Sequence, residues 1–324
     1  MTPAAFIPAR LRDGAGLLRA REFRNVFLAQ SVSVFGDGIT PVALTFAVLD
    51  LTGSGTDLGL VLAAQSIPLV GLALVGGVWA DRLPRAAIMV TSDLIRAFAQ
   101  ITGATLLLTG AAQIWQLALL AALHGAAEAF FRPAAGAILP QIVPAPRLQQ
   151  ANALMGMSDN FGWMVGPAMA GVLVGVIGPG GAIAVDGATF LVSAAFLTTL
   201  HVPAVLRPGA AQGFLTELRG GWQEVRSRTW LWVMLLRACL VLFIVIAPFQ
   251  VLGPLGLREH GYGAAAWGWL QAVFAAGMIV GMLIAMRYRP RRPMVTVALT
   301  GSTAIAAPLA MAVFGDPWVL GVVY

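Results

Sequence analysis

The sequence predicts an all-α, polytopic membrane protein, and three observations lead to this prediction. First, the 324 residues are 59% hydrophobic and only 10% charged, with a mean hydropathy of +0.84, and a soluble domain needs more charge than this to cover its surface. Second, the apolar residues form runs of about 20 or more, the length that a helix needs to cross a bilayer. Third, short clusters of arginine separate these runs.

Nine apolar runs are long enough to cross a membrane as helices. They cover residues 25–49, 57–80, 86–109, 113–138, 151–177, 181–201, 230–253, 264–286 and 294–314. A tenth run begins at Trp318 and stops at Tyr324, and such a short segment rises only about 10 Å as a helix. We therefore expect the sequence to end inside a tenth helix.

The connections between the runs alternate in charge. Of the 20 basic residues, all of which are Arg, 17 fall in the N-terminal tail and in or beside every second connection, whereas only Arg258 falls in the other connections. Cytoplasmic loops of membrane proteins carry an excess of basic residues. Since the lack of Lys and the richness in Ala and Gly are typical of a GC-rich bacterium, we expect a multi-pass protein of the bacterial cell (inner) membrane with a cytoplasmic N-terminus.

The longest connection divides the chain. We expect four parts: a cytoplasmic tail at 1–24, a six-helix bundle at 25–201, a cytoplasmic linker at 202–229, and a partial second bundle at 230–324 with helices seven to nine and the start of a tenth. In the linker, four apolar residues are spaced as on one helix face: Phe214, Leu218, Trp222 and Val225. This spacing indicates an amphipathic helix on the membrane surface, and an ordinary loop is the alternative.

A motif follows the second run. Gly77, Asp81, Arg82 and Arg85 match the Gly-x-x-x-Asp-Arg-x-x-Arg signature between the second and third helices of the major facilitator superfamily, which the chain resembles from about residue 20 onward. Glycine lets two helix ends approach, and Asp81 can accept hydrogen bonds from a helix N-terminus or pair with Arg85. The resemblance implies two bundles of six helices and a motif that locks the cytoplasmic side shut. A positive-inside turn that happens to contain Asp is the alternative.

Further stretches resemble parts of the same family. Gly162, Gly166 and Pro167 in the fifth run resemble the Gly-x-x-x-Gly-Pro pattern of the family's exporters, with ordinary small-residue packing as the alternative. Residues 287–292 resemble a degenerate second copy of the Asp-Arg motif, without its Asp. Three segments are similar to the enterobactin-exporter and macrolide-efflux-like branch: 33–38, 130–134 and 139–154.

Six ionisable residues lie inside the predicted spans toward their cytoplasmic ends. They are the acids Asp93, Glu128 and Asp159 and the bases Arg96, Arg132 and Arg237. Each costs at least a few kcal/mol in a membrane, so it normally pairs or serves a function. Asp93–Arg96 and Glu128–Arg132 are three and four residues apart, so each pair can meet on one helix face. We expect an inner layer of charge pairs that forms an inward gate. Glu128, Asp159 and Asn160 are also candidates for proton coupling or substrate binding.

Asp37 differs from these six residues. It lies about 19 Å along the helix from Arg24, near mid-membrane, where we expect no basic partner. Gly36 and Gly38 flank it and leave space for water or substrate. Such a carboxylate can take up and release a proton, or bind a cationic substrate. A carboxylate hydrogen-bonded to nearby backbone or to Gln65 is the alternative.

The favoured function is a secondary active transporter that exports small molecules by proton antiport. The resemblance implies a drug, a macrolide or a siderophore-like substrate; the partners are this substrate, protons and the lipid bilayer. A truncated inactive or accessory protein is the second hypothesis, because the sequence stops inside a predicted helix. A membrane-embedded enzyme is the least favoured, since His124, His201 and His260 lack metal-ligand spacing and His124 suits a satisfied packing group. We expect no cofactor, and no nucleic-acid partner, because the arginines form no single basic face.

Overall fold

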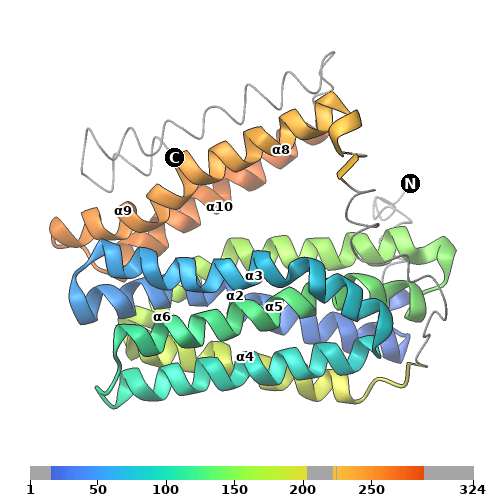
Figure 1. Cartoon of the computed structure of the whole chain (residues 1–324), viewed down its shortest axis with the longest axis horizontal. Coiled ribbons are helices and arrows are strands. Elements are labelled where there is room, and N and C mark those ends of the chain that lie inside the picture. Colours follow the sequence, from blue (N-terminus) through green and yellow to red (C-terminus); the bar gives the residue numbers. More distant parts are fainter. Residues whose placement is uncertain (1–15, 203–221, 224, 288–324) are drawn as a thin grey trace, which may run out of the picture.

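The computed structural model describes residues 16–202, 222–223 and 225–287, and in these ranges it is helical without strands (Figure 1). Its main helices are α2 (Arg21–Thr52), α3 (Gly55–Arg82), α4 (Arg85–Leu108), α5 (Ile114–Ile142), α6 (Leu148–Thr198), α8 (Thr229–Val241), α9 (Ala247–Glu259) and α10 (Ala264–Arg287). A short 3-10 helix, η1 (Ala145–Arg147), precedes α6, and a π-helical segment, η2 (Leu242–Ile246), joins α8 to α9. Five described helical stretches are long and apolar enough to cross a membrane. The predicted all-α polytopic fold is confirmed.

Local sequence explains where several helices begin and end. The Ser54 side chain accepts a hydrogen bond from the backbone N–H of Asp57 and so caps the start of α3. Gln113 and Gln116 form reciprocal side chain–backbone hydrogen bonds at the start of α5. Gly53 ends α2 with a φ of 66°, a left-handed conformation that glycine adopts without steric cost. These turns hold consecutive helices close together in antiparallel order.

The long helix α6 contains two of the predicted spans. Its backbone leaves helical geometry at Gly178, where φ is 74° and ψ is 169°. The Ser158 hydroxyl donates a hydrogen bond to the Ser31 hydroxyl at 2.6 Å, and the Thr199 hydroxyl accepts one from the Asn25 side-chain amide at 2.7 Å. Both arms of α6 therefore end beside the start of α2, so the chain reverses direction at Gly178, where an uncharged turn was expected.

Two predicted boundaries are wrong, and in both cases the helix continues past the predicted end and contains proline. The fourth predicted run ends at residue 138, but α5 continues through Pro133 and Pro140 to Ile142. The turn expected at 253–263 is instead helical as far as Glu259, with Pro254 inside α9. Proline is tolerated within membrane helices because neighbouring groups replace the hydrogen bond that it removes.

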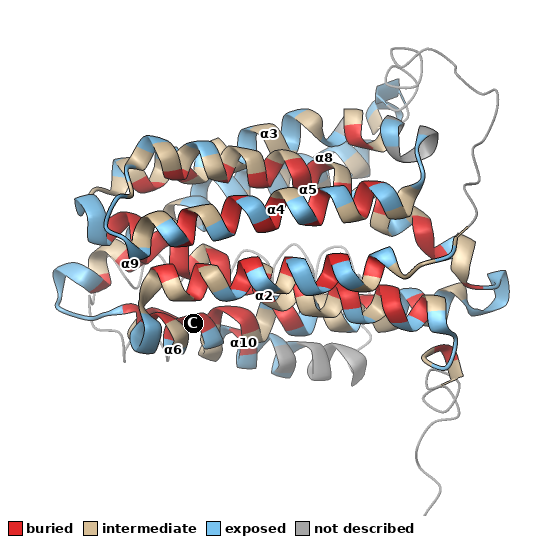
Figure 2. Cartoon of the chain, turned by 90° about the horizontal axis from the view of Figure 1, so that it is seen from below, coloured by how far each residue is buried: buried red, intermediate tan, exposed pale blue. Residues whose placement is uncertain are grey.

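The helices run alternately between two ends of the molecule. The Arg-rich end contains the start of α2, the α3–α4 and α5–α6 connections and the start of α8. The Arg-poor end contains the α2–α3, α4–α5 and α9–α10 connections and Gly178. Buried residues occur along the whole of α2, which packs against both arms of α6 (Figure 2). Since α3 packs against α5, and α4 against both α5 and α6, the first six spans form one bundle.

The second group of helices, α8 to α10, contacts this bundle at the Arg-poor end. A Cβ built on Gly171 of α6 would lie 2.7 Å from the Cα atom of Gly268 of α10, so the two backbones touch. Arg258 Nη1 lies 3.0 Å from Asp50 Oδ1. A shared hydrophobic core at this end includes Phe46, Val174, Phe249, Leu257 and Trp267. By contrast, α8 has no buried residue and diverges from α3 toward the Arg-rich end (Figure 1).

Several predicted features lie outside the described residues. They are the tail before residue 16, most of the amphipathic segment 214–225, the second arginine motif after Arg287, the run 294–314 and the run that begins at Trp318.

Candidate functional site

A cavity of about 370 Å³ lies in the Arg-rich half of the first bundle. Its charged lining comes from α2, α4, α5 and α6, and consists of Asp37, Arg96, Glu128, Arg132 and Asp159. Its apolar lining includes Val34, Phe131, Leu139, Met155 and Trp163. This size and mixture of surfaces fit a small-molecule site, in which apolar walls bind and a few polar groups orient the ligand.

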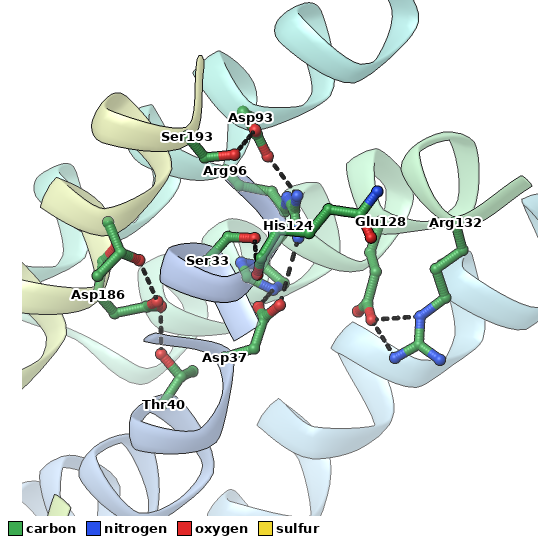
Figure 3. Close-up of polar contacts among 12 residues, drawn as sticks. Ser33, Asp37, Thr40, Asp93, Arg96, His124, Glu128, Arg132, Asp186 and Ser193 are labelled. Carbon is green, nitrogen blue, oxygen red and sulfur yellow. Dashed lines mark hydrogen bonds and ion pairs between the residues drawn. The ribbon is translucent and has the colours of Figure 1, made fainter. Parts of the chain in front are cut away.

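Asp37 and Asp93 share the guanidinium of Arg96 at the inner end of this cavity (Figure 3). Arg96 donates a hydrogen bond to Asp93 Oδ1, and its Nη1 lies 3.6 Å from Asp37 Oδ2. Ser193 donates to the other oxygen of Asp93 at 2.6 Å. Asp93 is fully buried and Arg96 is 1% exposed. Two carboxylates thus share one buried cation.

The expectation that Asp37 has no basic partner is therefore wrong. It rested on Cα depth along each helix, whereas the long side chain of Arg96 extends from α4 to the level of Asp37. The space beside Asp37 is the cavity itself, and the flanking glycines do not provide it as expected. A Cβ at Gly36 would collide with Asp186 and Thr189, and one at Gly38 would lie 2.8 Å from the carbonyl oxygen of Gly162. Both glycines are there for close helix packing.

Two aromatic rings enclose the shared guanidinium. The Arg96 Cζ atom lies 4.2 Å from the ring centroid of Phe131 and 4.3 Å from that of Phe190. A cation over an aromatic face is attracted by the ring quadrupole, more strongly when water is excluded. The rings therefore hold Arg96 in place while it faces two acids.

His124 lies on the other side of Asp37. Its Nε2 is 3.9 Å from Asp37 Oδ1, and its ring packs edge-on against Phe190 with centroids 5.6 Å apart. Its Nδ1 is buried and has no hydrogen-bond partner among the described residues. The expectation of a satisfied packing group is thus only half right, because the ring packs but one nitrogen is unsatisfied.

Asp186 is a buried acid that the sequence analysis missed. It is fully buried in the second arm of α6, and it accepts hydrogen bonds from Thr40 Oγ1 and Gln100 Nε2, each at 2.5 Å. The signal was available, because Asp186 is an ionisable residue in the predicted span 181–201. The rule that selected Asp37 should have selected it as well.

The remaining acidic candidates lie nearer the Arg-rich end. Arg132 Nε donates to Glu128 Oε1 at 2.7 Å, so the pair expected from their spacing is present. Asp159 lines the same cavity, but Asn160 is exposed and donates to the backbone oxygen of Gly156 at 2.7 Å. Asn160 is not among the residues that line the cavity, because it points to a different side of α6 than Asp159 does. Arg237 lies on α8, and it is not among the residues that line the cavity.

The motif after α3 is described in part. Arg85 Nη1 donates to the backbone oxygen of Ala137 at 2.8 Å, which ties the start of α4 to α5. A Cβ at Gly76 would collide with the backbone of Ala129, whereas no described atom lies within 4 Å of one at Gly77. The close approach expected at Gly77 is therefore made by its neighbour, since successive residues face different sides of a helix. The side chains of Asp81 and Arg82 lie outside the described residues.

The Gly-x-x-x-Gly-Pro segment of α6 packs against α2. A Cβ at Gly166 would lie 2.6 Å from the Cα of Gly38, and one at Gly162 would lie 2.5 Å from Val34 Cγ1. Pro167 Cδ lies 3.5 Å from the Cβ position of Gly38. Small residues at these positions let two helix backbones meet, as they commonly do in membranes.

Comparison with known protein families decides what this bundle is. The family model described as Major Facilitator Superfamily matches residues 26–324. The chain belongs to the major facilitator superfamily. Membership fits the observed all-α polytopic fold and points to a multi-pass membrane transporter.

Relatives in the superfamily are identical to this chain at about a quarter of the aligned positions. An uncharacterized MFS-type transporter of Bacillus subtilis, YfiS, is 29% identical over 312 residues, which are 92% of this chain and 72% of YfiS. Macrolide efflux protein A of Streptococcus pyogenes is 24% identical, over 81% of this chain and 65% of its own. The multidrug efflux pump Tap of Mycolicibacterium fortuitum is 27% identical, over 83% and 69%. The chain thus spans roughly two thirds of the length of these relatives.

A solved structure shares the fold. A bacterial homolog of the human lysosomal transporter Spinster, crystallised in an inward-facing and unoccupied conformation, matches with a TM-score of 0.69 and 20% identity. The match covers 93% of this chain and 72% of that transporter. The major-facilitator fold is therefore shared by proteins whose sequences have largely diverged.

Proposed function

We propose that the chain acts in proton-coupled export of small molecules, of the macrolide and multidrug type. One observation carries this proposal: Asp37 and Asp93 share the single guanidinium of Arg96, and Asp37 also lines the cavity. If both acids are ionised, one negative charge is left without a cation in a largely buried cluster. Such a charge is costly, so binding a proton or a cationic ligand at this site is favourable.

The contacts favour Asp37 over Asp93 as the group that exchanges its proton. Asp93 is fully buried and is hydrogen-bonded by both Arg96 and Ser193. Asp37 is 17% exposed and meets Arg96 only at 3.6 Å. When Asp37 is protonated, the Arg96 guanidinium pairs with Asp93 alone. When Asp37 is ionised, the two carboxylates compete for that guanidinium. A substrate in the cavity therefore feels a different charge before and after proton release.

The nature of the cavity supports a lipophilic solute with a polar or cationic group. Trp163, Phe131 and Met155 supply apolar surface, and Glu128 and Asp159 supply negative charge toward its Arg-rich side. The names of two relatives, a macrolide efflux protein and a multidrug efflux pump, support the same class. The enterobactin-exporter and macrolide-efflux-like branch is accordingly our proposed placement within the superfamily.

We also propose an orientation and a gate. The Arg-rich end faces the cytoplasm of a bacterial inner membrane, because positive charge is retained inside. The four-part division at residues 1–24, 25–201, 202–229 and 230–324 follows from this topology. The segment Gly77–Arg85 and the pairs formed by Arg96 and Arg132 serve as the inward gate. The segment Gly162–Pro167 provides the helix contact typical of exporters.

Replacing Asp37 with Asn tests the proposed coupling. The change keeps the shape of the side chain and leaves Arg96 paired with Asp93, so the protein should fold normally. Proton-driven export should be lost, because the amide cannot exchange a proton. Accumulation of a fluorescent dye or a macrolide in cells expressing the chain, with and without a proton uncoupler, measures the effect.

Asp57→Asn is the matched control, since it makes the same chemical change in the first turn of α3, far from the cavity. It should export as wild type does. Undiminished uncoupler-sensitive export by Asp37→Asn would remove Asp37 from the mechanism. A wild-type chain that lowers the accumulation of no tested compound would contradict the exporter proposal itself.

A further inference from the structure

The buried carboxylate Asp186 lies beside Thr40 and apart from the Asp37 cluster (Figure 3), and its partners place it one layer nearer the Arg-poor end. Thr40 is one helical turn beyond Asp37 on α2, and Gln100 is one turn beyond Arg96 on α4. Both donate to Asp186 Oδ2, and Gln100 Nε2 also donates to Thr40 Oγ1 at 2.7 Å. The polar groups of three helices thus continue inward from the shared arginine.

No basic nitrogen among the described residues lies within 4 Å of the Asp186 carboxylate. Its partners there are neutral: Thr40, Gln100 and, at 3.4 Å, the hydroxyl of Thr189. The 2.5 Å between Thr40 Oγ1 and Asp186 Oδ2 is a direct hydrogen bond, with no place for a metal ion between the two oxygens. A fully buried carboxylate with neutral partners is stabilised most simply by a proton.

A small cavity lies between His124 and the two side chains, Thr40 and Gln100, that donate to this carboxylate. Its volume is about 20 Å³, and its polar lining is Thr40, Gln65, Gln100 and His124. That volume fits one water molecule, and several polar groups are available to bind it. Nε2 of His124 faces Asp37, and its buried Nδ1 has no partner among the described residues. The imidazole therefore lies between Asp37 and the cavity that Thr40 also lines.

We propose that Asp186 is a second proton-binding residue, and that His124, one water molecule and the Thr40 hydroxyl carry the proton between Asp37 and Asp186. The Asp37 carboxyl gives its proton to Nε2 of His124. The imidazolium then releases the proton on Nδ1 to the water. The water protonates the Thr40 hydroxyl as that hydroxyl gives its own proton to Asp186 Oδ2. One proton has moved, Asp37 is ionised, Asp186 is neutral, and the reverse sequence restores the original histidine tautomer.

The charged groups around this path act on Asp37 in opposite senses. Arg96 on α4 attracts the ionised form of Asp37, whereas Asp93, which pairs with the same guanidinium, favours the protonated form, so the proton both leaves and returns readily. The titratable groups that face the path are Asp37 from α2, Asp93 and Arg96 from α4, and His124 and Glu128 from α5. A proton bound at Asp186 lies closer to the Arg-poor end than one bound at Asp37. The inference rests on the proposed proton coupling, and it adds a route by which the proton reaches the other side.

Infrared difference spectroscopy of the 324-residue chain in lipid nanodiscs tests the inference without any substrate. Acidification should give two carbonyl-stretch bands of buried carboxylic acids. Asp186→Asn should remove one band and Asp37→Asn the other. After a rapid pH jump, Thr40→Val should slow the appearance of the Asp186 band about a hundredfold, the lower range of what a positioned proton donor contributes. Thr40→Ser, which restores the hydroxyl, should restore the rate.

Thr45→Val is the matched control on the same helix as Thr40. Its hydroxyl donates to the backbone oxygen of Pro41 at 2.7 Å, and Thr45 does not line the small cavity. The control should leave the rate close to that of wild type. A wild-type spectrum without an Asp186 band, or a wild-type rate in Thr40→Val, would overturn the inference. A wild-type spectrum that lacks only the Asp37 band, or normal export by Asp37→Asn, would instead count against the proposed function.

Discussion

Replacing Arg96 with Met is expected to lower the free energy of unfolding by about 3–5 kcal/mol, the usual effect of removing one partner of a buried ion pair. Methionine fills a similar volume between Phe131 and Phe190, so packing is largely kept. Asp93, however, is left fully buried with Ser193 as its remaining hydrogen-bond donor among the described side chains. Thermal and denaturant unfolding in detergent measure the loss.

Two further variants separate the buried charge from other causes. The double variant Asp93→Asn, Arg96→Met should recover a large part of the lost stability, because it removes both ends of the pair. Arg258→Met breaks the pair with Asp50, in which both side chains are substantially exposed, and should cost about 1 kcal/mol or less. If Arg96→Met and Arg258→Met lower the free energy of unfolding equally, the buried pair contributes no more to stability than the exposed pair.

Gly166→Val is expected to destabilise the first bundle by about 1–3 kcal/mol or more through overpacking. The new Cβ would lie 2.6 Å from the Cα atom of Gly38. Gly38 has no side chain that could rotate away, so the backbones of α2 and α6 must separate. That separation would also pull Asp37 away from its contacts, since Asp37 is adjacent to Gly38. Size-exclusion chromatography and thermal unfolding of the purified protein report the change.

Gly175→Val is the matched control on the same helix. No described atom lies within 4 Å of its Cβ position, and Gly175 is exposed. Any change in intrinsic helix propensity is the same in the two variants, so the difference between them measures the contact with α2. If both variants unfold at one temperature, the close packing at Gly166 contributes nothing.

Much of the fold follows from the sequence because a bilayer imposes a simple requirement. Every span must satisfy its backbone hydrogen bonds internally and must be long enough to cross, so apolar runs and arginine clusters predict helices and their order. The boundary errors fall where an apolar run ends near a proline but the helix continues through it, as at Pro140 and Pro254. Hydropathy alone does not reveal that neighbouring helices compensate for the lost hydrogen bond.

The site was less predictable, since it depends on contacts between helices. Spacing along one helix correctly suggested that Asp93 meets Arg96 and that Glu128 meets Arg132. The contact of Arg96 with Asp37 joins two helices and depends on side-chain reach, which a count of Cα rise omits. Likewise, Gly38 was interpreted as open space beside Asp37, although its role is to contact Gly166 on a helix far away in sequence.

The glycine contact between α6 and α10 has a mechanical consequence. At Gly171 and Gly268 two backbones touch with no side chain between them, so this point resists sliding or tilting far less than interlocked side chains would. From Gly268 to Arg287, α10 rises about 28 Å, so a tilt of about 10° at the contact displaces its far end by roughly 5 Å. The glycine pair can thus act as the fulcrum of a lever, in which a small rotation at one face of the membrane becomes a large opening at the other.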